Sequence, residues 1–542
     1  MGTLSRLPLL IHLAALGALA MLIPAAYASA TNAHVIARIF FYSSVLCLIV
    51  TAMIGIAMAA GPRGLQARNN LLTMVAVMTL LPLMLAIPFA QSQPDTGLFN
   101  AWWEMVSSLT TTGASLYAAE LLPAPLHLWR ATVGWLGGLF MLIAAVAILA
   151  PLRVGGFEIL SSPYGRTEHF ERLPQSANPR RDLRHLSGPA FETELADTNH
   201  RVWRAAIAVA PVYVGLTVAL WVILLLLGDA SMLALCRAMG TLATSGISPV
   251  TGSADHASGL LGEMVVFLFL LPALSRRLWP GGGELRASER MRDDPELRMA
   301  AVVVWLVALL LFARHFIGAI EVAGLAGEGV SSLQRMAAAL LAGWGGLFNA
   351  LSFLTTTGWN SAEWQGARAW SGLTSPGLML AGLAMFGGGV ATTAGGVKLL
   401  RVYALARHGE RELEKIVHPQ SVSGGGRMAR RLRREGAYLA FIFFMLFAIS
   451  IAATVALVSI HQLEFETATI LSVAALTNTG PLAGTIPLTP SFEGTAGVAS
   501  APWDGWSGLA GFTKAVLAGA MIVGRLETLA ILALFTPEFW RR

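Results

Sequence analysis

The chain contains few charged residues and almost no cysteine. Asp, Glu, Lys and Arg together make up 13% of its 542 residues, whereas soluble globular proteins carry about 25%. This deficit excludes an ordinary soluble domain. The two cysteines, Cys47 and Cys236, stand in apolar or membrane-adjacent sequence, and two isolated thiols make neither a disulfide framework nor a metal site. We expect both to be packing residues.

Long apolar runs take the place of the missing charge. Hydrophobic residues make up 55% of the chain, and the mean hydropathy is +0.64. A helix of about 20 apolar residues crosses the hydrocarbon core of a bilayer, so we predict an all-α, polytopic membrane protein. Ten runs have about this length: residues 8–28, 36–60, 70–90, 126–150, 203–227, 258–279, 298–320, 372–400, 436–460 and 510–535.

The first run also fits a secretory signal peptide. Arg6 precedes it, and the small-residue sequence AYASA ends it, as a cleavable signal requires. We favour a retained helix, because the apolar core is long and a second run follows directly.

The basic residues are unevenly placed along the chain. The net charge of +6 and the pI near 9.7 are compatible with nucleic-acid binding, but Lys and Arg gather in alternate loops. The intervening loops at 91–100, 461–466 and 485–509 carry none. By the positive-inside rule the basic loops are cytoplasmic, which places both termini inside. The excess of basic residues therefore reflects the membrane topology. We expect membrane lipid, and no nucleic acid, as a partner of the chain.

Four short stretches share one pattern: Leu, any residue, Thr or Asn, Thr or Ser, and Gly. We name them Thr-Gly loops 1 to 4, at residues 110–115, 243–248, 355–360 and 477–482. A long internal repeat decides the whole fold. Before each loop stands an apolar segment that we expect to form a half-membrane helix. These segments are FNAWWEMVSS, MLALCRAMG, LLAGWGGLFNA and ETATILSVAA.

Extended backbone at membrane depth is tolerated only where it is buried or lines a wet cavity. Four such loops around one axis would line a pore. Their backbone carbonyls and Thr hydroxyls replace the hydration shell of an ion, and Gly allows the backbone angles that this needs. The negative C-terminal ends of the preceding helices would favour a cation. The alternative, ordinary turn chemistry at a helix end, explains one copy better than four.

Beyond these loops, three segments carry a family resemblance: residues 387–402 (GGGVATTAGGVKLLRV), 411–422 (RELEKIVHPQSV) and 524–542 (GRLETLAILALFTPEFWRR). Residues 135–149 add a weaker match. The chain resembles potassium uptake subunits of the TrkH/KtrB type, in the TrkH branch, over nearly its full length. The resemblance implies fourfold pseudosymmetric helix, pore-loop, helix repeats around one ion pore, plus an N-terminal helix pair. The implied segments are the helix pair 1–62, repeat 1 at 63–152, a cytoplasmic linker 153–202, repeat 2 at 203–280, a cytoplasmic loop 281–297, repeat 3 at 298–408, a cytoplasmic linker 409–434 and repeat 4 at 435–542.

The resemblance also implies the residues that coordinate K⁺ in a selectivity filter. They are Thr111, Thr112, Gly113, Thr244, Ser245, Gly246, Thr356, Thr357, Gly358, Asn478, Thr479 and Gly480. All four glycines are present, which goes with K⁺ preference in this superfamily. The sequence TNTGPLAG in loop 4 and Trp359 in loop 3 depart from the usual pattern, and we look for unusual selectivity first in loop 4.

By the same resemblance, the chain is a homodimeric subunit of the bacterial inner membrane. It binds cytoplasmic TrkA/KtrA-like regulatory subunits, which carry the nucleotide, either NAD or ATP/ADP. This chain has K⁺ as its transported ion and no cofactor of its own.

Residues 387–396, GGGVATTAGG, interrupt an apolar run; we name them the glycine-rich loop. Each Gly costs about 1 kcal/mol against Ala inside a helix, so we expect the helix to break. The resemblance implies an intramembrane gate; the alternative is close packing of small residues between helices. Lys398 and Arg401 either snorkel to the interface or steady the loop, and the sequence leaves both open. The expected gate residues are Gly387, Gly388, Gly389, Thr392, Thr393, Gly395, Gly396, Lys398 and Arg525.

Arg525 lies inside an apolar run, where an unpaired charge costs at least about 2.5 kcal/mol. Glu527 is two positions on and so lies on another face of a helix. Arg525 is therefore expected to face the pore, beneath the filter by the resemblance; the alternative is a structural ion pair with another helix. Glu104, in the first half-membrane helix, is expected to be structural.

Two other classes of membrane protein fit less well. An alternating-access carrier also breaks helices near the midplane but tends to show two inverted repeats, whereas four motifs of the same sense occur here. A membrane enzyme would need a cluster of His, Asp, Glu or Cys within the spans, and the sequence shows none. Passive flux down the membrane potential is sufficient to drive K⁺ inward, because 100 mV contributes about 2.3 kcal/mol per charge.

Overall fold

The computed structural model describes most of the membrane part of the chain. Large parts of the predicted linkers at 153–202, 281–297 and 409–434 lie outside the described residues, as does the C-terminal segment after residue 527. The described residues are 9–58, 66–150, 156, 198–250, 256–280, 291, 294–322, 332–364, 366–367, 377–418, 434–461, 463–485 and 506–527.

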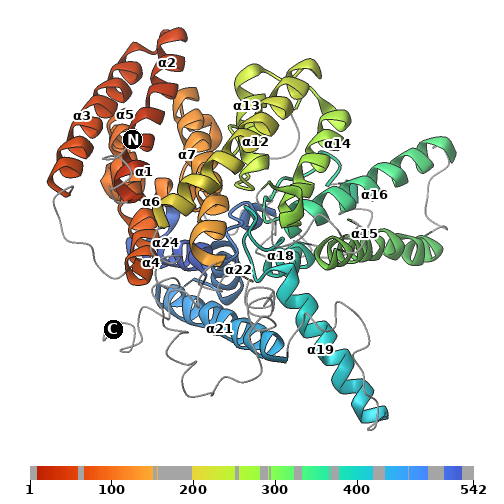
Figure 1. Ribbon diagram of the computed structural model, residues 1–542. Helices are drawn as coiled ribbons and strands as arrows, with labels where there is room; N and C mark the ends of the chain where they lie inside the picture. The colour runs from red at the N-terminus through yellow and green to blue at the C-terminus, as the bar shows by residue number, and fades with distance from the viewer. Residues whose placement is uncertain are drawn as a thin grey trace, which may run out of the picture.

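Every regular element in these ranges is helical, and the helices form one bundle (Figure 1). Eight helices are long and apolar enough to cross a membrane, which confirms the prediction of an all-α, polytopic membrane protein. They cover Leu9–Ala30, His34–Met58, Leu71–Ser92, Ala124–Leu149, His200–Leu226, Pro295–Phe312, Met336–Leu354 and Gly436–His461.

The N-terminal helix pair packs on one side of the bundle, drawn in red in Figure 1. The first apolar run forms α1 (Leu9–Ala20) and α2 (Leu22–Ala30), which pack against α3 (His34–Met58). The Ser44 hydroxyl donates to the Ala18 carbonyl at 2.7 Å and ties α3 to α1. Cys47 on α3 is buried, as is Cys236 in the second repeat, and both are free thiols.

The rest of the chain repeats one order of elements: a long helix, a helix that ends at a Thr-Gly loop, and a further helix. The helices that end at the loops are α6 (Gly97–Leu109), α13 (Ser231–Leu242), α16 (Ser332–Leu354) and α22 (Phe465–Leu476). Before them stand α5 (Leu81–Ser92), α12 (Thr198–Leu226), α15 (Pro295–Val322) and α21 (Arg434–Val458). After them stand α7 (Ala124–Ala144), α14 (Gly259–Leu270), α18 (Gly377–Phe386) and α24 (Gly511–Leu526).

The helix after each loop contacts the loop-ending helix of the next repeat. Thus α7 packs against α13, α14 against α16 and α18 against α22. The last of the series, α24, packs against α6 of the first repeat. These four contacts close a ring, and the four Thr-Gly loops are brought together inside it.

Two expectations about helix length were wrong. The third loop-ending helix, α16, has 23 residues rather than half-membrane length, because Ala, Leu, Met, Gln and Arg, all strong helix formers, precede the expected segment. The predicted spans at 258–279 and 372–400 contain shorter helices: α14 gives way at Leu271 to a 3₁₀ turn that contains Pro272, and α18 ends at Phe386. Beyond the glycine-rich loop, α19 (Leu399–Val417) extends away from the bundle (Figure 1).

Candidate functional site

The four Thr-Gly loops leave their helices through the same backbone hydrogen bonds. In loop 1 the N–H groups of Thr110, Thr111 and Thr112 donate to carbonyls four, three and five residues earlier, each at 2.9 Å. All four loops therefore share one backbone path, set locally by the helix end. The matching donor and acceptor pairs are Ala243 and Met239, Thr244 and Thr241, Ser245 and Gly240 in loop 2; Thr355 and Leu351, Thr356 and Phe353, Thr357 and Ser352 in loop 3; Thr477 and Val473, Asn478 and Ala475, Thr479 and Ala474 in loop 4.

The second residue of each Thr-Gly loop has a positive φ. The values are 57° at Thr111, 52° at Thr244, 57° at Thr356 and 56° at Asn478. A β-branched residue in this region is an outlier, whereas Asn adopts it more readily; such strain costs about 1 to 3 kcal/mol and gathers at functional sites. The same conformation at four equivalent positions, three of them strained Thr residues, marks these loops as the candidate site.

The four glycines leave no room for a side chain. Each glycine lies against the backbone or Pro481 of another loop, so that loop 1 meets loop 2, loop 2 meets loop 3, loop 3 meets loop 4 and loop 4 meets loop 1. A substituent would collide at each position. An added Cβ would lie 1.9 Å from Ser245 O at Gly113, 2.1 Å from Thr357 O at Gly246, 2.9 Å from Pro481 Cβ at Gly358 and 2.4 Å from Ala114 N at Gly480.

Loop 2 differs from the others in its side chains. Hydroxyl groups pair within loop 1, where Thr110 and Thr112 are 2.8 Å apart, and within loops 3 and 4 at 3.0 and 3.2 Å. Loop 2 has Ala243 at the first position, so the buried Ser245 hydroxyl finds no hydrogen-bond partner in the described part of the chain.

Loop 4 differs by its direct bonds to loop 1. The Gly480 N–H donates to the Thr112 carbonyl at 2.7 Å, and Asn478 Nδ2 donates to Thr112 Oγ1 at 3.0 Å and to the Met521 carbonyl at 2.9 Å. Gly113 has a φ of 76°, whereas Gly480 does not adopt a positive φ. The departure from the family pattern in loop 4 thus coincides with a local change of backbone.

A polar side chain nine residues before the glycine supports loops 1 and 3 from behind. Glu104 Oε2 accepts from the Leu116 N–H at 3.0 Å, and Asn349 Oδ1 accepts from the Ser361 N–H at 2.8 Å. Both N–H groups stand three residues after the glycine. A buried N–H must be paired, so these side chains fix the backbone where each loop leaves the ring.

Loops 2 and 4 need no side-chain acceptor for the residue three positions after the glycine. Pro249 stands three residues after Gly246 and has no N–H. In loop 4 the Ala483 N–H donates to the Gly480 carbonyl at 3.3 Å, and the position that Glu104 occupies in loop 1 is Leu471. A polar side chain therefore occurs behind the ring in loops 1 and 3, where this backbone N–H needs an acceptor.

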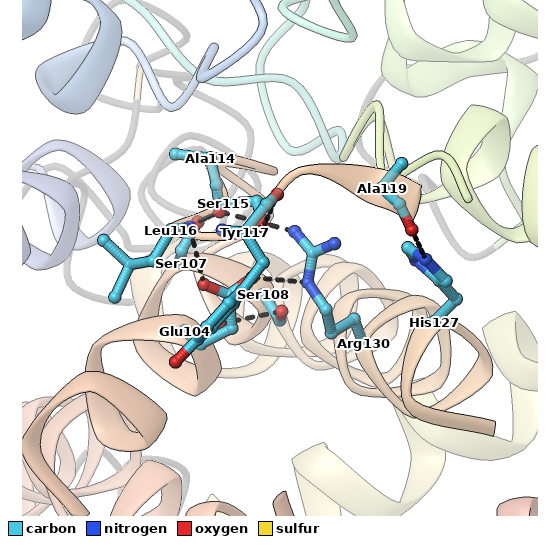
Figure 2. A network of polar contacts seen from close by, with 10 residues as sticks. All are labelled: Glu104, Ser107, Ser108, Ala114, Ser115, Leu116, Tyr117, Ala119, His127 and Arg130. Carbon is cyan, nitrogen blue, oxygen red and sulfur yellow. Dashed lines mark hydrogen bonds and ion pairs between the residues drawn. The ribbon is translucent and has the colours of Figure 1, made fainter. Parts of the chain in front are cut away.

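Glu104 also forms a buried ion pair, shown in Figure 2. Its Oε1 lies 2.6 Å from Nε of Arg130, and the two side chains are 0% and 3% exposed. The Ala114 carbonyl accepts from the Ser107 hydroxyl at 2.7 Å and from Arg130 at 3.5 Å. Breaking a buried pair of this kind costs about 3 to 5 kcal/mol. The expectation that Glu104 is structural fits this geometry.

Repeat 2 carries the opposite charges at these two positions. Arg237 stands nine residues before Gly246, and Glu263 stands seventeen after it, where repeat 1 has Glu104 and Arg130. Glu263 accepts from the Ala362 N–H at 2.6 Å and from the Ser361 hydroxyl at 2.7 Å, so it supports loop 3. Sequence analysis missed Arg130, Asn349 and Glu263, although their fixed offsets from the glycines were available as a signal.

The glycine-rich loop breaks the helix, as predicted. The non-helical backbone runs from Gly387 to Lys398, two residues beyond the expected end. Its two ends are joined by backbone bonds from Val397 to Met385 at 3.0 Å and from Lys398 to Phe386 at 2.9 Å. The residues between them project as a loop.

The projecting part of the glycine-rich loop contacts three Thr-Gly loops. The Thr393 carbonyl accepts from the Thr244 hydroxyl at 2.8 Å, and the Gly395 N–H donates to the Thr356 hydroxyl at 2.7 Å. An added Cβ at Gly395 would lie 2.2 Å from the Thr477 carbonyl. The strained second residues of loops 2 and 3 thus hold the glycine-rich loop through their side chains.

Three buried cations surround this loop. Arg525 Nη1 donates to the Thr393 carbonyl at 2.7 Å, and it makes no ion pair within the described ranges. Lys398 Nζ donates to the Ala394 carbonyl, and Arg401 Nη2 donates to Glu527 Oε2 at 2.7 Å. Lys398 and Arg401 are 8% and 0% exposed. Neither side chain snorkels to the surface of the described part, and Arg401 also donates to the Val397 carbonyl at 3.1 Å. That they steady the gate stays a prediction.

The comparisons with known proteins agree with this geometry. Residues 294–542 match the TrkH family, described as cation transport protein. The "Trk system potassium uptake protein TrkH" of Salmonella typhimurium is 27% identical over 88% of this chain and 87% of that protein. The TrkH protein of Halomonas elongata is 28% identical over 85% and 82%.

A solved structure gives the same fold. The crystal structure of the potassium transporter TrkH from Vibrio parahaemolyticus matches over the whole of both chains, with a TM-score of 0.70 and 22% sequence identity. The chain therefore has the fold of this structure, and by its sequence it is similar to proteins of the TrkH family, which are transport proteins.

Proposed function

We propose that this chain is the ion-conducting subunit of a bacterial potassium uptake system. The relatives named above are potassium uptake proteins, and the eight apolar helices support a multi-pass protein of the cytoplasmic membrane. The observation that carries the proposal is the ring of four Thr-Gly loops, in which each glycine faces a neighbouring loop and has no room for a side chain.

In this proposal the Thr-Gly loops form the selectivity filter. Carbonyl and hydroxyl oxygens of the twelve filter residues, Thr111 to Gly113, Thr244 to Gly246, Thr356 to Gly358 and Asn478 to Gly480, replace the hydration shell of K⁺. The shared backbone hydrogen bonds support it, because they give the oxygens of all four loops matching positions. Only loops 1 and 4 are joined directly by hydrogen bonds among the described residues, so the four sides of the ring are not chemically equivalent.

The glycine-rich loop is the gate in this proposal. It lies against Thr-Gly loops 2 to 4 and is held there by Thr244, Thr356 and Arg525. This arrangement is the closed one, and opening requires those three hydrogen bonds to break. Arg525 adds a positive charge in the same place, which repels a cation as long as the loop stays closed.

Regulation is assigned to partners on the cytoplasmic side. The family resemblance favours a homodimer, with both termini in the cytoplasm. It also favours a ring of TrkA/KtrA-like subunits, which bind NAD or ATP/ADP. The word "system" in the relatives' name fits a second component.

The direct test is growth of potassium-uptake-deficient bacteria at low K⁺, with the regulatory subunit supplied. The wild-type chain is expected to restore growth, and Gly113→Ser and Gly246→Ser are expected to fail or to admit Na⁺. Gly519→Ala is the matched control, because an added Cβ there meets nothing within 4 Å. Failure of the wild-type chain, or normal K⁺ selectivity in both glycine variants, would contradict the proposal.

A further inference from the structure

One buried acidic residue near the glycine-rich loop has no place in the mechanism so far. Glu296 is the second residue of α15 and is 5% exposed. Its Oε1 accepts from the backbone N–H of Val390 at 2.7 Å, and Val390 is 1% exposed. A side chain that is 94 residues away in sequence therefore holds the backbone of the loop.

Glu296 acts on a different part of the loop from Thr244, Thr356 and Arg525. Those three hold Thr393 and Gly395, whereas the first part rests on backbone contacts from the turn after α14. The Gly389 N–H donates to the Ala273 carbonyl at 3.0 Å, and an added Cβ at Gly389 would lie 2.3 Å from the Leu274 carbonyl. Glu296 adds a carboxyl acceptor directly beside this contact.

The position of Glu296 is itself fixed by Asp294. Asp294 Oδ1 accepts from the Glu296 N–H at 3.0 Å, and its Oδ2 accepts from the Ser275 hydroxyl at 2.6 Å. Ser275 belongs to the same turn after α14 that supports Gly389. The start of α15 and the first part of the glycine-rich loop are therefore fastened to one turn, and Glu296 joins them.

A buried carboxyl oxygen that accepts from a buried N–H favours the one loop position that allows the bond, because a buried N–H without a partner is costly. When the loop leaves this position, the bond is lost. We propose that Glu296 is a positioning residue that latches the closed glycine-rich loop through Val390, an inference that rests on the gate assigned under the proposed function.

The experiment compares K⁺ flux in proteoliposomes for the full chain and three variants. Glu296→Leu removes the acceptor at nearly equal volume and is expected to raise flux about two- to tenfold, the factor that one hydrogen bond supplies. Glu296→Gln keeps an acceptor oxygen and is expected to stay within about twofold of the wild type. Arg525→Ala tests the gate itself and is expected to raise flux.

The outcomes separate the latch from the gate. If Arg525→Ala raises flux while Glu296→Leu does not, the latch is wrong and the gate stands. If neither raises flux, the gate assignment fails. Equal increases for Glu296→Leu and Glu296→Gln would show that the acceptor oxygen does not hold the loop, and would overturn the inference.

A second readout follows the loop when a variant folds poorly. Thr392→Cys places a thiol on the glycine-rich loop, while the native Cys47 and Cys236 are buried and give a low background. Labelling by a water-soluble thiol reagent is expected to be faster when Glu296→Ala is added. An unchanged labelling rate would overturn the latch.

Discussion

The Thr-Gly loops and the glycine-rich loop are both non-helical backbone at the centre of the bundle, yet they are held in opposite ways. Each Thr-Gly loop is fixed by hydrogen bonds to its own preceding helix, three to five residues back. The glycine-rich loop is held by side chains 39 to 149 residues away. The backbone of the Thr-Gly loops is set mainly by local bonds, with added bonds from loop 4 to loop 1 and from Glu263 to the residues directly after loop 3. The projecting part of the glycine-rich loop is held mainly by distant side chains.

This difference fits the two proposed roles. A filter must keep its oxygens at fixed distances, and local bonds to a helix end survive motion elsewhere. A gate must have two positions that differ by a small free energy. Bonds from several repeats to one loop are made and lost together when those repeats shift, which suits a switch.

The same substitution in the two loops is expected to act in opposite directions. Gly246→Ala places a Cβ 2.1 Å from the Thr357 carbonyl, so we expect it to distort the filter and abolish K⁺ uptake. Gly395→Ala places a Cβ 2.2 Å from the Thr477 carbonyl and is expected to push the gate away and raise flux. K⁺ flux is measured in proteoliposomes for both variants, with Gly519→Ala as the control. Loss of flux in both variants would contradict the expected difference between the two kinds of loop.

Removal of Arg525 is expected to give the next largest effect. Arg525→Ala deletes the bond to the Thr393 carbonyl and a buried positive charge on the proposed ion path. Cation flux in reconstituted vesicles should rise several-fold. Unchanged flux would contradict the placement of Arg525 at the gate.

A smaller effect is expected behind the filter. Asn349→Leu leaves the buried Ser361 N–H without its acceptor, which costs about 1 to 3 kcal/mol, and we expect a lower melting temperature and a lower ratio of K⁺ to Na⁺ flux. Leu471→Met, at the equivalent position in repeat 4, is the control, because the Ala483 N–H is bonded to the Gly480 carbonyl. Equal effects in the two variants would argue against the bracing role.

The smallest effect is expected on the exposed helix α19. Arg407 and Glu410 form an ion pair at 2.6 Å with side chains that are 51% and 62% exposed, and such surface pairs contribute between about 0 and 1 kcal/mol. Arg407→Ala should leave both thermal unfolding and ion flux nearly unchanged. A marked change in flux without the regulatory subunits would show that α19 is coupled to the gate within this chain.

The sequence predicts the locally built part of the molecule better than the rest. The Thr-Gly loops and the helix break at Gly387 are set by residues that are close together in the sequence, so both could be predicted from it. The length of α16 was misjudged because a half-membrane helix was assumed from the resemblance of the motifs. The bonds from Glu296 and Glu263 join distant segments, and nothing local in the sequence specifies such pairs.

The central claim is that the proposed filter and the proposed gate are separate structures, the first fixed mainly by local bonds and the second mainly by distant side chains. The most direct test is the reversal potential of Arg525→Ala in a planar bilayer, with a K⁺ gradient across the membrane and Na⁺ as the competing cation. If the claim holds, the current is larger than for the wild type and the reversal potential stays near the K⁺ equilibrium value. A reversal potential that moves towards zero would show that opening the gate also destroys the filter, and would contradict the account.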